Sequence, residues 1–431
     1  MATKTLCENI NQAINDFNDI KQAIISKGQE VPDGTDTSQY DDIILEIETG
    51  SKVVDTSTVT DFYEFCAYNR LGDQAENIDT SSGTDFTCMF SECTTLTTVP
   101  ELDTSNGTNF SSMFYKCSTL TTVPELDTSN GTNFGGMFNE CKALPTVPDL
   151  DVSNGTNFNS MFYECKALAT VPELDANKGT SFSYMFYNCS KLTTIPKLDA
   201  RSGTNFFRTF GGCKALTSIL ELNISSGTDF SQMFNGCNAL TTLPGELATS
   251  NGTNFSSMFN SCYVLPAIPK IDTGNGTNFS SMFKYCYVLT TVPDLDVSKG
   301  TRFDSMFSGC KALTTVPDLD VSNGTNFDGM FYGCRGVETL SLTSFISSSD
   351  MFSGCTALKN LIVSGTITVN NNYFNLSASK ELTVDSLLNV LNALADNTGG
   401  TTYTITLGSD NLAKLTDEQK AIATNKNYTL A

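Results

Sequence analysis

The sequence repeats one stretch, Thr108-Asn109-Phe110-Ser111-Ser112-Met113-Phe114-Tyr115-Lys116-Cys117-Ser118-Thr119-Leu120-Thr121-Thr122-Val123-Pro124-Glu125-Leu126-Asp127, along most of its length. Its Met-Phe pair returns at a step that is usually 24 residues. The methionines of these pairs are Met89, Met113, Met137, Met161, Met185, Met233, Met258, Met282, Met306, Met330 and Met351, and Thr209 stands where one more would fall. Such self-similarity is typical of solenoids, in which each unit stacks only on its neighbours. The sequence therefore predicts a repeat solenoid over residues 89–357.

Each unit carries two apolar patterns in succession. Its first half places Phe110, Met113, Phe114 and Cys117 at the i, i+3, i+4 and i+7 positions, which predicts one face of a short helix. Residues 120–126 alternate apolar side chains with β-forming threonines and predict a short parallel strand. We therefore expect an α/β repeat solenoid, resembling leucine-rich repeats in its 24-residue unit of short helix plus short strand.

The end of each unit is rich in turn residues. Pro124 has no N–H group, so a strand ladder is expected to stop near it. In the run Asp127-Thr128-Ser129-Asn130-Gly131, the aspartate is expected to cap local amides and Gly131 to take a positive φ. The recurring acidic pairs, such as Glu125 with Asp127, leave Ca²⁺ binding open as an alternative to turn capping, because Ca²⁺ takes several oxygen ligands.

The chain has 15 cysteines, and most of them occupy a single position in the repeat. These are Cys93, Cys117, Cys141, Cys165, Cys189, Cys213, Cys237, Cys262, Cys286, Cys310, Cys334 and Cys355. Stacked units would place their sulfurs in one inward-pointing column. A metal site would need paired ligands such as C-x-x-C, so we expect a ladder of buried, reduced thiols and no bound metal.

The regions that flank the array differ from it. Residues 1–50 predict a helical docking or oligomerisation module, and residues 51–88 an N-terminal cap with a degenerate repeat. Residues 358–431 predict a C-terminal α+β cap that includes a helix at residues 383–395 and a second helix opened by the capping box Thr416-x-x-Gln419. The N-terminal module has an apolar seam spaced 4-3-4-3-4, formed by Leu6, Ile10, Ala13, Phe17, Ile20 and Ile24. Two interpretations remain open for this seam: a parallel homo-oligomer, such as a trimer, or a helical hairpin within one chain.

Composition excludes several classes of function. The formal charge of −22 and a pI near 4.3 disfavour binding to nucleic acid and to anionic membranes. The chain has no histidine, the most frequent general base and metal ligand. We therefore predict no enzyme, no catalytic residue and no cofactor. No apolar run is long enough for a signal peptide or a membrane span, so we expect a protein assembled in the cytoplasm.

The repeat resembles a known family. The pattern Leu-x-x-Val-Pro-x-Leu-Asp-x-Ser-Asn-Gly-Thr-Asn-Phe-x-x-Met-Phe-x-x-Cys, over residues 85–358, is similar to the BspA-like leucine-rich repeats of bacterial and mycoplasma surface proteins. It departs from them in its recurrent proline and in the glycine of its turn. Residues 27–35 resemble openings of bacteriophage tail-fibre and baseplate proteins, and residues 415–423 and 427–431 resemble endings of phage-encoded repeat proteins. The first resemblance implies adhesion to a surface, and the second implies a virion component.

These resemblances lead to one functional hypothesis and two alternatives. The hypothesis is a phage tail-fibre or baseplate protein, located in the virion, whose residues 1–50 dock to other tail proteins and whose solenoid binds a glycan or protein of the host surface. The expected contact residues are tyrosines at variable positions of the repeat, because tyrosine is a rigid, amphipathic contact residue. They are Tyr115, Tyr163, Tyr187, Tyr263, Tyr285, Tyr287 and Tyr332. The alternatives are a bacterial BspA-like adhesin and a structural spacer of the virion.

Overall fold

The computed structural model describes residues 56–69 and 78–431. The chain divides into two compact units, Met1–Val54 and Asp55–Ala431. The predicted helical module at residues 1–50, with its seam of Leu6, Ile10, Ala13, Phe17, Ile20 and Ile24, lies outside the described residues. Its two interpretations therefore stay predictions, and the description below concerns the second unit.

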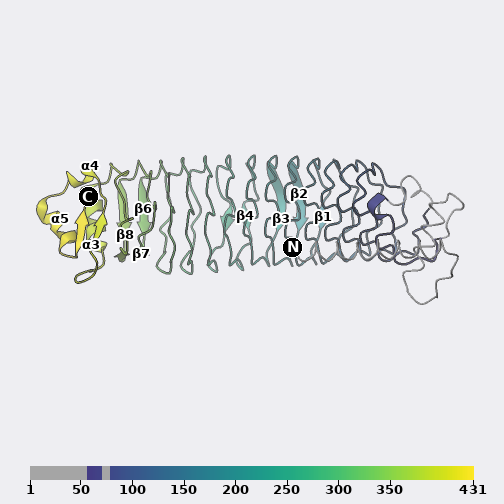
Figure 1. The fold of residues 1–431 in the computed structure, drawn as a ribbon, viewed down its shortest axis with the longest axis horizontal. Helices are drawn as coiled ribbons and strands as arrows, with labels where there is room; N and C mark the ends of the chain where they lie inside the picture. The colour runs from purple at the N-terminus through teal and green to yellow at the C-terminus, as the bar shows by residue number, and fades with distance from the viewer. Residues whose placement is uncertain (1–55, 70–77) are drawn as a thin grey trace, which may run out of the picture. The chain divides into compact units, whose positions relative to one another are not determined.

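The second unit is a β-solenoid of about 11 turns, followed by a small C-terminal cap (Figure 1). Regular elements are short, because turns and irregular strands make up most of each repeat. In chain order the elements are η1 (Ala67–Asn69), β1 (Leu174–Asp175), β2 (Thr194–Asp199), β3 (Ser218–Asn223), β4 (Glu246–Leu247), β5 (Lys270–Ile271), β6 (Thr339–Leu342), β7 (Phe345–Ile346), β8 (Asn360–Val363), β9 (Ile367–Thr368), α3 (Val384–Ala393), β10 (Tyr403–Ile405), α4 (Ser409–Leu412), α5 (Asp417–Thr424) and β11 (Tyr428–Leu430).

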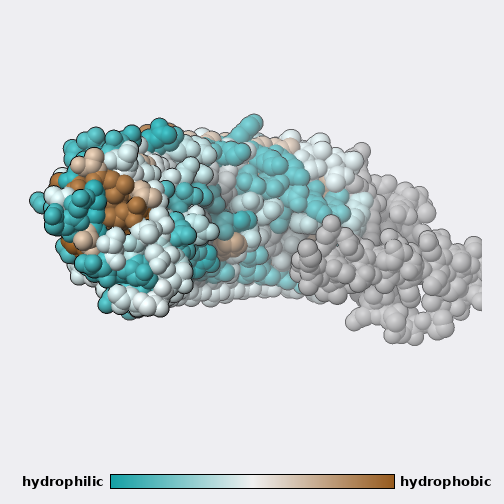
Figure 2. Space-filling model, turned by 60° about the vertical axis from the view of Figure 1, so that its left-hand side comes forward, coloured by the Kyte–Doolittle hydropathy of each residue, from teal (hydrophilic) through white to brown (hydrophobic). Residues whose placement is uncertain are grey.

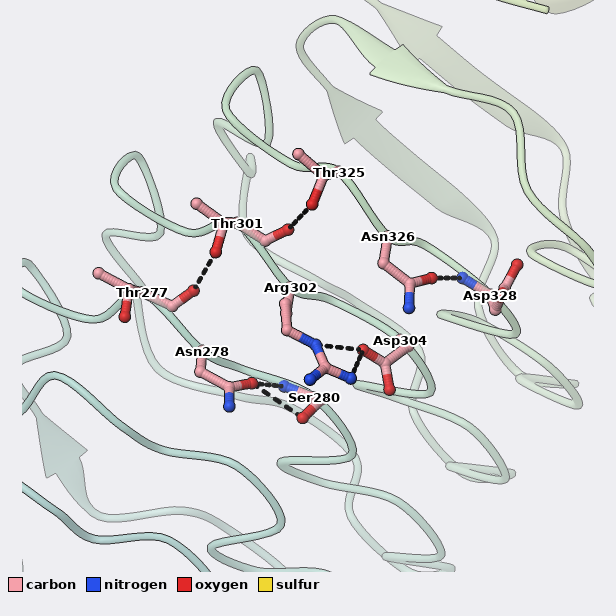
Figure 3. Close-up of polar contacts among 9 residues, drawn as sticks. All are labelled: Thr277, Asn278, Ser280, Thr301, Arg302, Asp304, Thr325, Asn326 and Asp328. Carbon is pink, nitrogen blue, oxygen red and sulfur yellow. Dashed lines mark hydrogen bonds and ion pairs between the residues drawn. The ribbon is translucent and has the colours of Figure 1, made fainter. Parts of the chain in front are cut away.

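Neighbouring turns pair in parallel and in register. Strands β1, β2 and β3 form one parallel sheet in which Leu174 faces Leu198 and Leu198 faces Leu222, a shift of one repeat at each step. A second ladder of single bridges joins the residue before each repeat phenylalanine, from Asp61 through to Asn326. Figure 3 shows the threonines that precede three of these residues. The hydroxyls of Thr301 and Thr325 each donate to the carbonyl of the threonine one turn earlier. Stacking in register therefore builds columns of like side chains.

The predicted short helix in each repeat is wrong. The segment from Phe110 to Cys117 consists of two successive turns, closed by the amide of Met113 donating to the carbonyl of Phe110 and the amide of Cys117 donating to that of Phe114. The amide of Phe114 would donate to the Phe110 carbonyl in a helix, but here it donates to the carbonyl of Met137 in the following repeat. Two four-residue turns place apolar side chains at i, i+3, i+4 and i+7, just as a helix does, so apolar spacing alone could not separate the two structures.

Each pair of turns requires two residues with positive φ. The first precedes the methionine and the second precedes the cysteine, as at Ser112 (φ 55°) and Lys116 (φ 57°). Glycine takes the second of these positions in Gly212, Gly236, Gly309, Gly333 and Gly354. The left-handed conformation costs a residue with a Cβ roughly 1–2 kcal/mol, which explains the recurrent glycine.

This conformation predicts the effect of glycine at Ser281, whose φ is 56°. Because glycine relieves the left-handed strain, Ser281→Gly should leave stability unchanged or raise it by up to about 1 kcal/mol. In a helix the same substitution would lower stability, because glycine has a lower helix propensity than serine. Urea unfolding measures the difference. The matched control is Ser280→Gly, which removes a hydroxyl bonded to Asn278 and should destabilise; a loss of stability in Ser281→Gly would contradict the turn structure.

The core consists of two phenylalanine columns together with columns of methionine, cysteine and leucine. Rings of neighbouring turns stack 5.2–5.9 Å apart over most of the array, as for Phe110 on Phe134 and Phe114 on Phe138. The repeat cysteines of the described residues are buried free thiols, as predicted. In most turns the thiol donates to the carbonyl of a phenylalanine 27 or 28 residues earlier, at 2.9 Å for Cys117. Thr209 keeps its place among the methionines because its hydroxyl bonds two buried carbonyls.

The turn residues act only partly as predicted. Asp127 accepts from the amide of Ser129 at 3.1 Å and from its hydroxyl at 2.6 Å, so it caps the turn. Gly131, however, does not have a positive φ. Glycine is required there because a Cβ would lie 2.4 Å from Cζ of Phe134, so the ring packs directly against the backbone.

Proline shortens the strands without ending every ladder. Pro196 lies inside β2, and pairing with β3 resumes at the next residue, Lys197. Strand β3 has Leu220 where other repeats have proline. In several proline-containing turns only single bridges form, such as Thr98 with Thr122. Proline therefore limits pairing in the strand segment, as expected from its missing N–H.

The predicted elements after the array are confirmed. The helix expected at residues 383–395 is α3, and its N-cap Thr383 accepts from the amide of Ser386. The predicted capping box opens α5. The Thr416 hydroxyl accepts from the amide of Gln419, and the Gln419 side chain accepts from the amide of Thr416. Among the described helices, none combines the length and apolar character that crossing a bilayer requires.

Candidate functional site

The variable side chains of the repeat lie along one edge of the solenoid. We call this surface the turn edge; it comprises the double turns from phenylalanine to cysteine and the residue after each cysteine. All of the tyrosines predicted to bind a partner occupy it, because they lie one or two residues before, or one residue after, a repeat cysteine. Their side chains are half-buried or exposed, whereas the phenylalanine, methionine and cysteine of the same turns are buried.

The structure gathers some of these tyrosines into a first cluster. Tyr163 and Tyr187 belong to successive turns and stack with ring centroids 5.2 Å apart. Tyr184 meets the edges of both rings, at 6.0 Å and 5.5 Å, and also contacts Phe207 at 5.1 Å. The guanidinium of Arg208 lies over Tyr184, Tyr187 and Phe207, 5.3–5.8 Å from the ring centroids. Burial first, and then the carboxylate of Glu164, raise the pKa of the Tyr163 hydroxyl, so it remains a neutral hydrogen-bond donor at physiological pH.

Tyr263, Tyr285 and Tyr287 form a second cluster in later turns. Tyr263 and Tyr287 stack at 5.1 Å with their planes 12° apart, and Tyr285 lies 5.9 Å from Tyr287. The ammonium groups of Lys311 and Lys284 lie over the rings of Tyr287 and Tyr285, at 4.5 Å and 5.2 Å from the centroids. Such cation–π contacts hold the rings in place at the surface.

A shallow groove of about 360 Å³ adjoins the second cluster. Tyr285 forms one wall and Tyr332 another, so the groove connects two predicted contact residues that do not stack. The lining residues are Lys284, Tyr285, Ser305, Ser308, Asp328, Gly329, Tyr332, Ser349 and Asp350. The amide of Ser349 donates to Asp328 Oδ1 at 3.0 Å, and Figure 3 shows how Asn326 accepts from the amide of Asp328. Hydroxyl and carboxylate oxygens therefore line the groove.

Tyr115 lies apart from both clusters. Its ring is covered by the ammonium of Lys116 at 4.8 Å, and that ammonium forms an ion pair with Glu92 at 3.0 Å. Tyr115 therefore belongs to a separate polar contact between two turns.

Sequence reasoning missed several members of the clusters. In the first cluster these are Tyr184, Phe207 and Arg208, and in the second they include Lys311 and the exposed Val264 and Val288. Tyr184 and Arg208 occupy the left-handed position before the methionine or its replacement, whose side chain would point elsewhere on a helix. The available signal was the presence of bulky residues at a position where most repeats have serine or glycine.

The recurring aspartates of the Asp-x-Ser turns form hydrogen bonds within their own turns. Asp103, Asp127, Asp151, Asp296 and Asp320 each accept from the serine two residues later. These bonds, the serine hydroxyl before the amide, lower the pKa of Asp127, Asp151, Asp296 and Asp320. Within the described ranges, no group of three histidine, cysteine or acidic side chains is arranged to hold a metal ion.

The repeat array matches a family of proteins described as "Mycoplasma protein of unknown function, DUF285". The matches fall on residues 38–146, 97–197, 121–221, 180–290, 204–316 and 266–365, and together they cover more than half of the chain. The chain belongs to this family. No curated protein matches the chain.

Several solved bacterial structures are similar to this DUF285 protein. A leucine-rich cell surface protein of Faecalibacterium prausnitzii is 21% identical over 63% of this chain and 78% of its own, with a TM-score of 0.33. A leucine-rich-repeat protein of Bacteroides ovatus is 16% identical over 78% and 88%, with a TM-score of 0.41. The functional domain of InlJ from Listeria monocytogenes, which includes a cysteine ladder, is 14% identical over 76% and 70%, with a TM-score of 0.25.

Proposed function

We propose that this protein is a non-enzymatic binding protein that contacts a cell surface through the turn edge of its solenoid. The observation that carries the proposal is the gathering of tyrosines from separate turns into two stacked clusters on that edge. Single exposed aromatic side chains are ordinary, but clusters of them are enriched where proteins bind partners. The proposal assigns no catalytic residue and no cofactor, and the partner is a glycan or protein of the bound cell.

The finer proposal is adhesion of a phage particle to its host. In this version the protein is a tail-fibre or baseplate component assembled in the host cytoplasm. Residues 1–50 would dock to other tail proteins or form a homo-oligomer. It is supported only by the similarity of residues 27–35, 415–423 and 427–431 to phage proteins.

A bacterial surface adhesin is the second candidate, and the family match favours it. The matched family is described as a Mycoplasma family, and the repeat resembles the BspA-like repeats of bacterial surface proteins. In both proposals the turn edge is the contact surface. They differ in whether a phage particle or a bacterial cell carries the protein. A structural spacer, the third possibility, would require no ligand at all.

The test is a binding titration of the full-length protein on intact bacterial cells from a panel that includes mycoplasmas. We expect saturable binding that depends on the strain, because contact by specific side chains discriminates between surfaces. Binding is measured with and without Ca²⁺, since a dependence on the ion would assign a role to the turn aspartates despite their local bonds. Absence of saturable binding to every strain would contradict the proposal and favour the spacer.

A further inference from the structure

We infer that the second tyrosine cluster and the groove beside it bind an extended, uncharged oligosaccharide. This inference rests on the proposed surface-binding function and adds the chemical class and the position of the ligand. The site comprises the stacked rings of Tyr263 and Tyr287, the ring of Tyr285 tilted against Tyr287, and the groove that is also lined by Tyr332 and Asp350.

The first argument is the concentration of exposed apolar surface. Tyr263, Val264, Tyr285 and Val288 are 36%, 41%, 38% and 42% exposed, and they lie in two neighbouring turns. The face shown in Figure 2 is mostly hydrophilic, and its main apolar patch lies at the C-terminal end of the chain. Flat aromatic faces next to aliphatic groups suit the C–H faces of sugar rings, which are apolar in the same way.

The second argument is the polarity of the adjoining groove. Ser305 and Ser308 provide hydroxyls, and Asp328 and Asp350 provide carboxylates. Sugar hydroxyls both donate and accept hydrogen bonds, so they fit a wall of hydroxyl and carboxylate oxygens. A volume of about 360 Å³ lies at the lower end of the range for small-ligand sites. An aromatic platform next to such a groove is therefore complementary to the two faces of a saccharide.

The third argument is the shape of the site. Its residues come from five successive turns, from the turn of Tyr263 to the turn of Asp350. Turns stacked at strand spacing would spread these residues over roughly 19 Å along the solenoid. A linear ligand that runs along the stack can contact all of them at once, whereas a single sugar cannot.

The backbone and the charge narrow the ligand further. The amides of Tyr285 and Gly309 donate to carbonyls of the next turn, at 2.8 Å and 2.7 Å, so an added peptide strand cannot pair with them. Recognition is then left to side chains. Because the chain carries a formal charge of −22 and the groove contains two carboxylates, an anionic polymer would be repelled.

Gly309 positions the Tyr285 ring. A Cβ at Gly309 would lie 2.7 Å from Cδ1 of Tyr285, and the φ of this glycine is 78°. The equivalent residue of the preceding turn is Tyr285 itself, at φ 62°. The glycine therefore lets the ring lie across the next turn and form the wall of the groove.

The test compares the full-length protein with a variant that carries Tyr285→Gly and Tyr287→Ser. Both replacements occur naturally in the repeat, since Gly309 and Gly333 match the first position and Ser190 matches the second. The control is Tyr373→Ala, which removes a tyrosine that is 59% exposed outside the site. Binding is measured on strains that bind the wild-type protein, after periodate oxidation of surface sugars or after protease treatment, and on neutral polysaccharide isolated from the same cells.

We expect periodate, but not protease, to abolish binding. The double variant should bind cells and polysaccharide at least tenfold more weakly, while its melting temperature and the binding of Tyr373→Ala stay unchanged. Binding that resists periodate, is lost on protease treatment and is retained by the double variant would overturn the inference and leave surface binding intact. If the wild-type protein binds no cells, both the inference and the proposed function fail.

Discussion

Raising the pH from 8 to 12 is expected to destabilise the protein steeply because of its buried cysteines. Burial raises the pKa of Cys213, Cys286 and Cys355 to about 12, whereas an unfolded thiol ionises near 9.0. Between these values the unfolded chain releases protons that the folded chain retains. The stabilisation is therefore complete below pH 9 and is lost as the pH rises toward 12, by about 1.4 kcal/mol per pH unit for each such thiol.

Melting temperatures measured at intervals between pH 8 and 12, under reducing conditions, follow this loss. Tyrosines and lysines also titrate in the range, so the cysteine contribution is isolated with Cys213→Ala. This variant has one thiol fewer and should lose stability less steeply with pH than the wild-type protein. Equal slopes for the two proteins would show that the cysteine column does not cause the alkaline instability.

Replacing Phe158 by alanine should cost about 3–5 kcal/mol of unfolding free energy. The ring is fully buried and stacks on Phe134 at 5.7 Å and on Phe182 at 5.2 Å, so its removal leaves a cavity inside a continuous column. Because each turn contacts only its neighbours, the damaged turn also weakens both flanking interfaces. Urea unfolding measures the loss.

The matched control for this prediction is Tyr373→Ala, which truncates an exposed aromatic side chain and should change stability by less than about 0.5 kcal/mol. A change of less than about 1 kcal/mol in Phe158→Ala would mean that the phenylalanine columns are not the core of the array.

Much of the architecture could be predicted because the period of the repeat leaves few choices. A spacing of 24 residues brings Cys93 and Cys117 into one buried column and stacks the side chains of Tyr163 and Tyr187. The capping box at Thr416 was recognisable because it depends on residues three apart in sequence. Residues at the same position of the repeat, or close together along the chain, could thus be paired without a structure.

Conformation within the repeat could not be obtained in the same way. The spacing of Phe110, Met113, Phe114 and Cys117 fits a helix and a pair of turns equally well. Only the glycines before some of the cysteines and methionines, such as Gly309 and Gly136, indicate the left-handed residues that decide between them. Some contacts of the site could not be predicted for the same reason. Contacts between different repeat positions, such as Tyr184 with Phe207, depend on the path of the turns.

Whether the turn edge is the contact surface is tested most directly by the cell binding of two variants, one changed on the turn edge and the other on the strands. The first variant changes the turn edge, with Tyr163→Asn, Tyr187→Asn, Tyr285→Gly and Tyr287→Ser. The second changes the exposed apolar residues of the strands, with Leu220→Ala on β3 and Ile362→Ala on β8. At equal melting temperatures, we predict that the first variant loses saturable binding and the second keeps it. Binding retained by the first variant and lost by the second would contradict the account and place the contact surface on the strands.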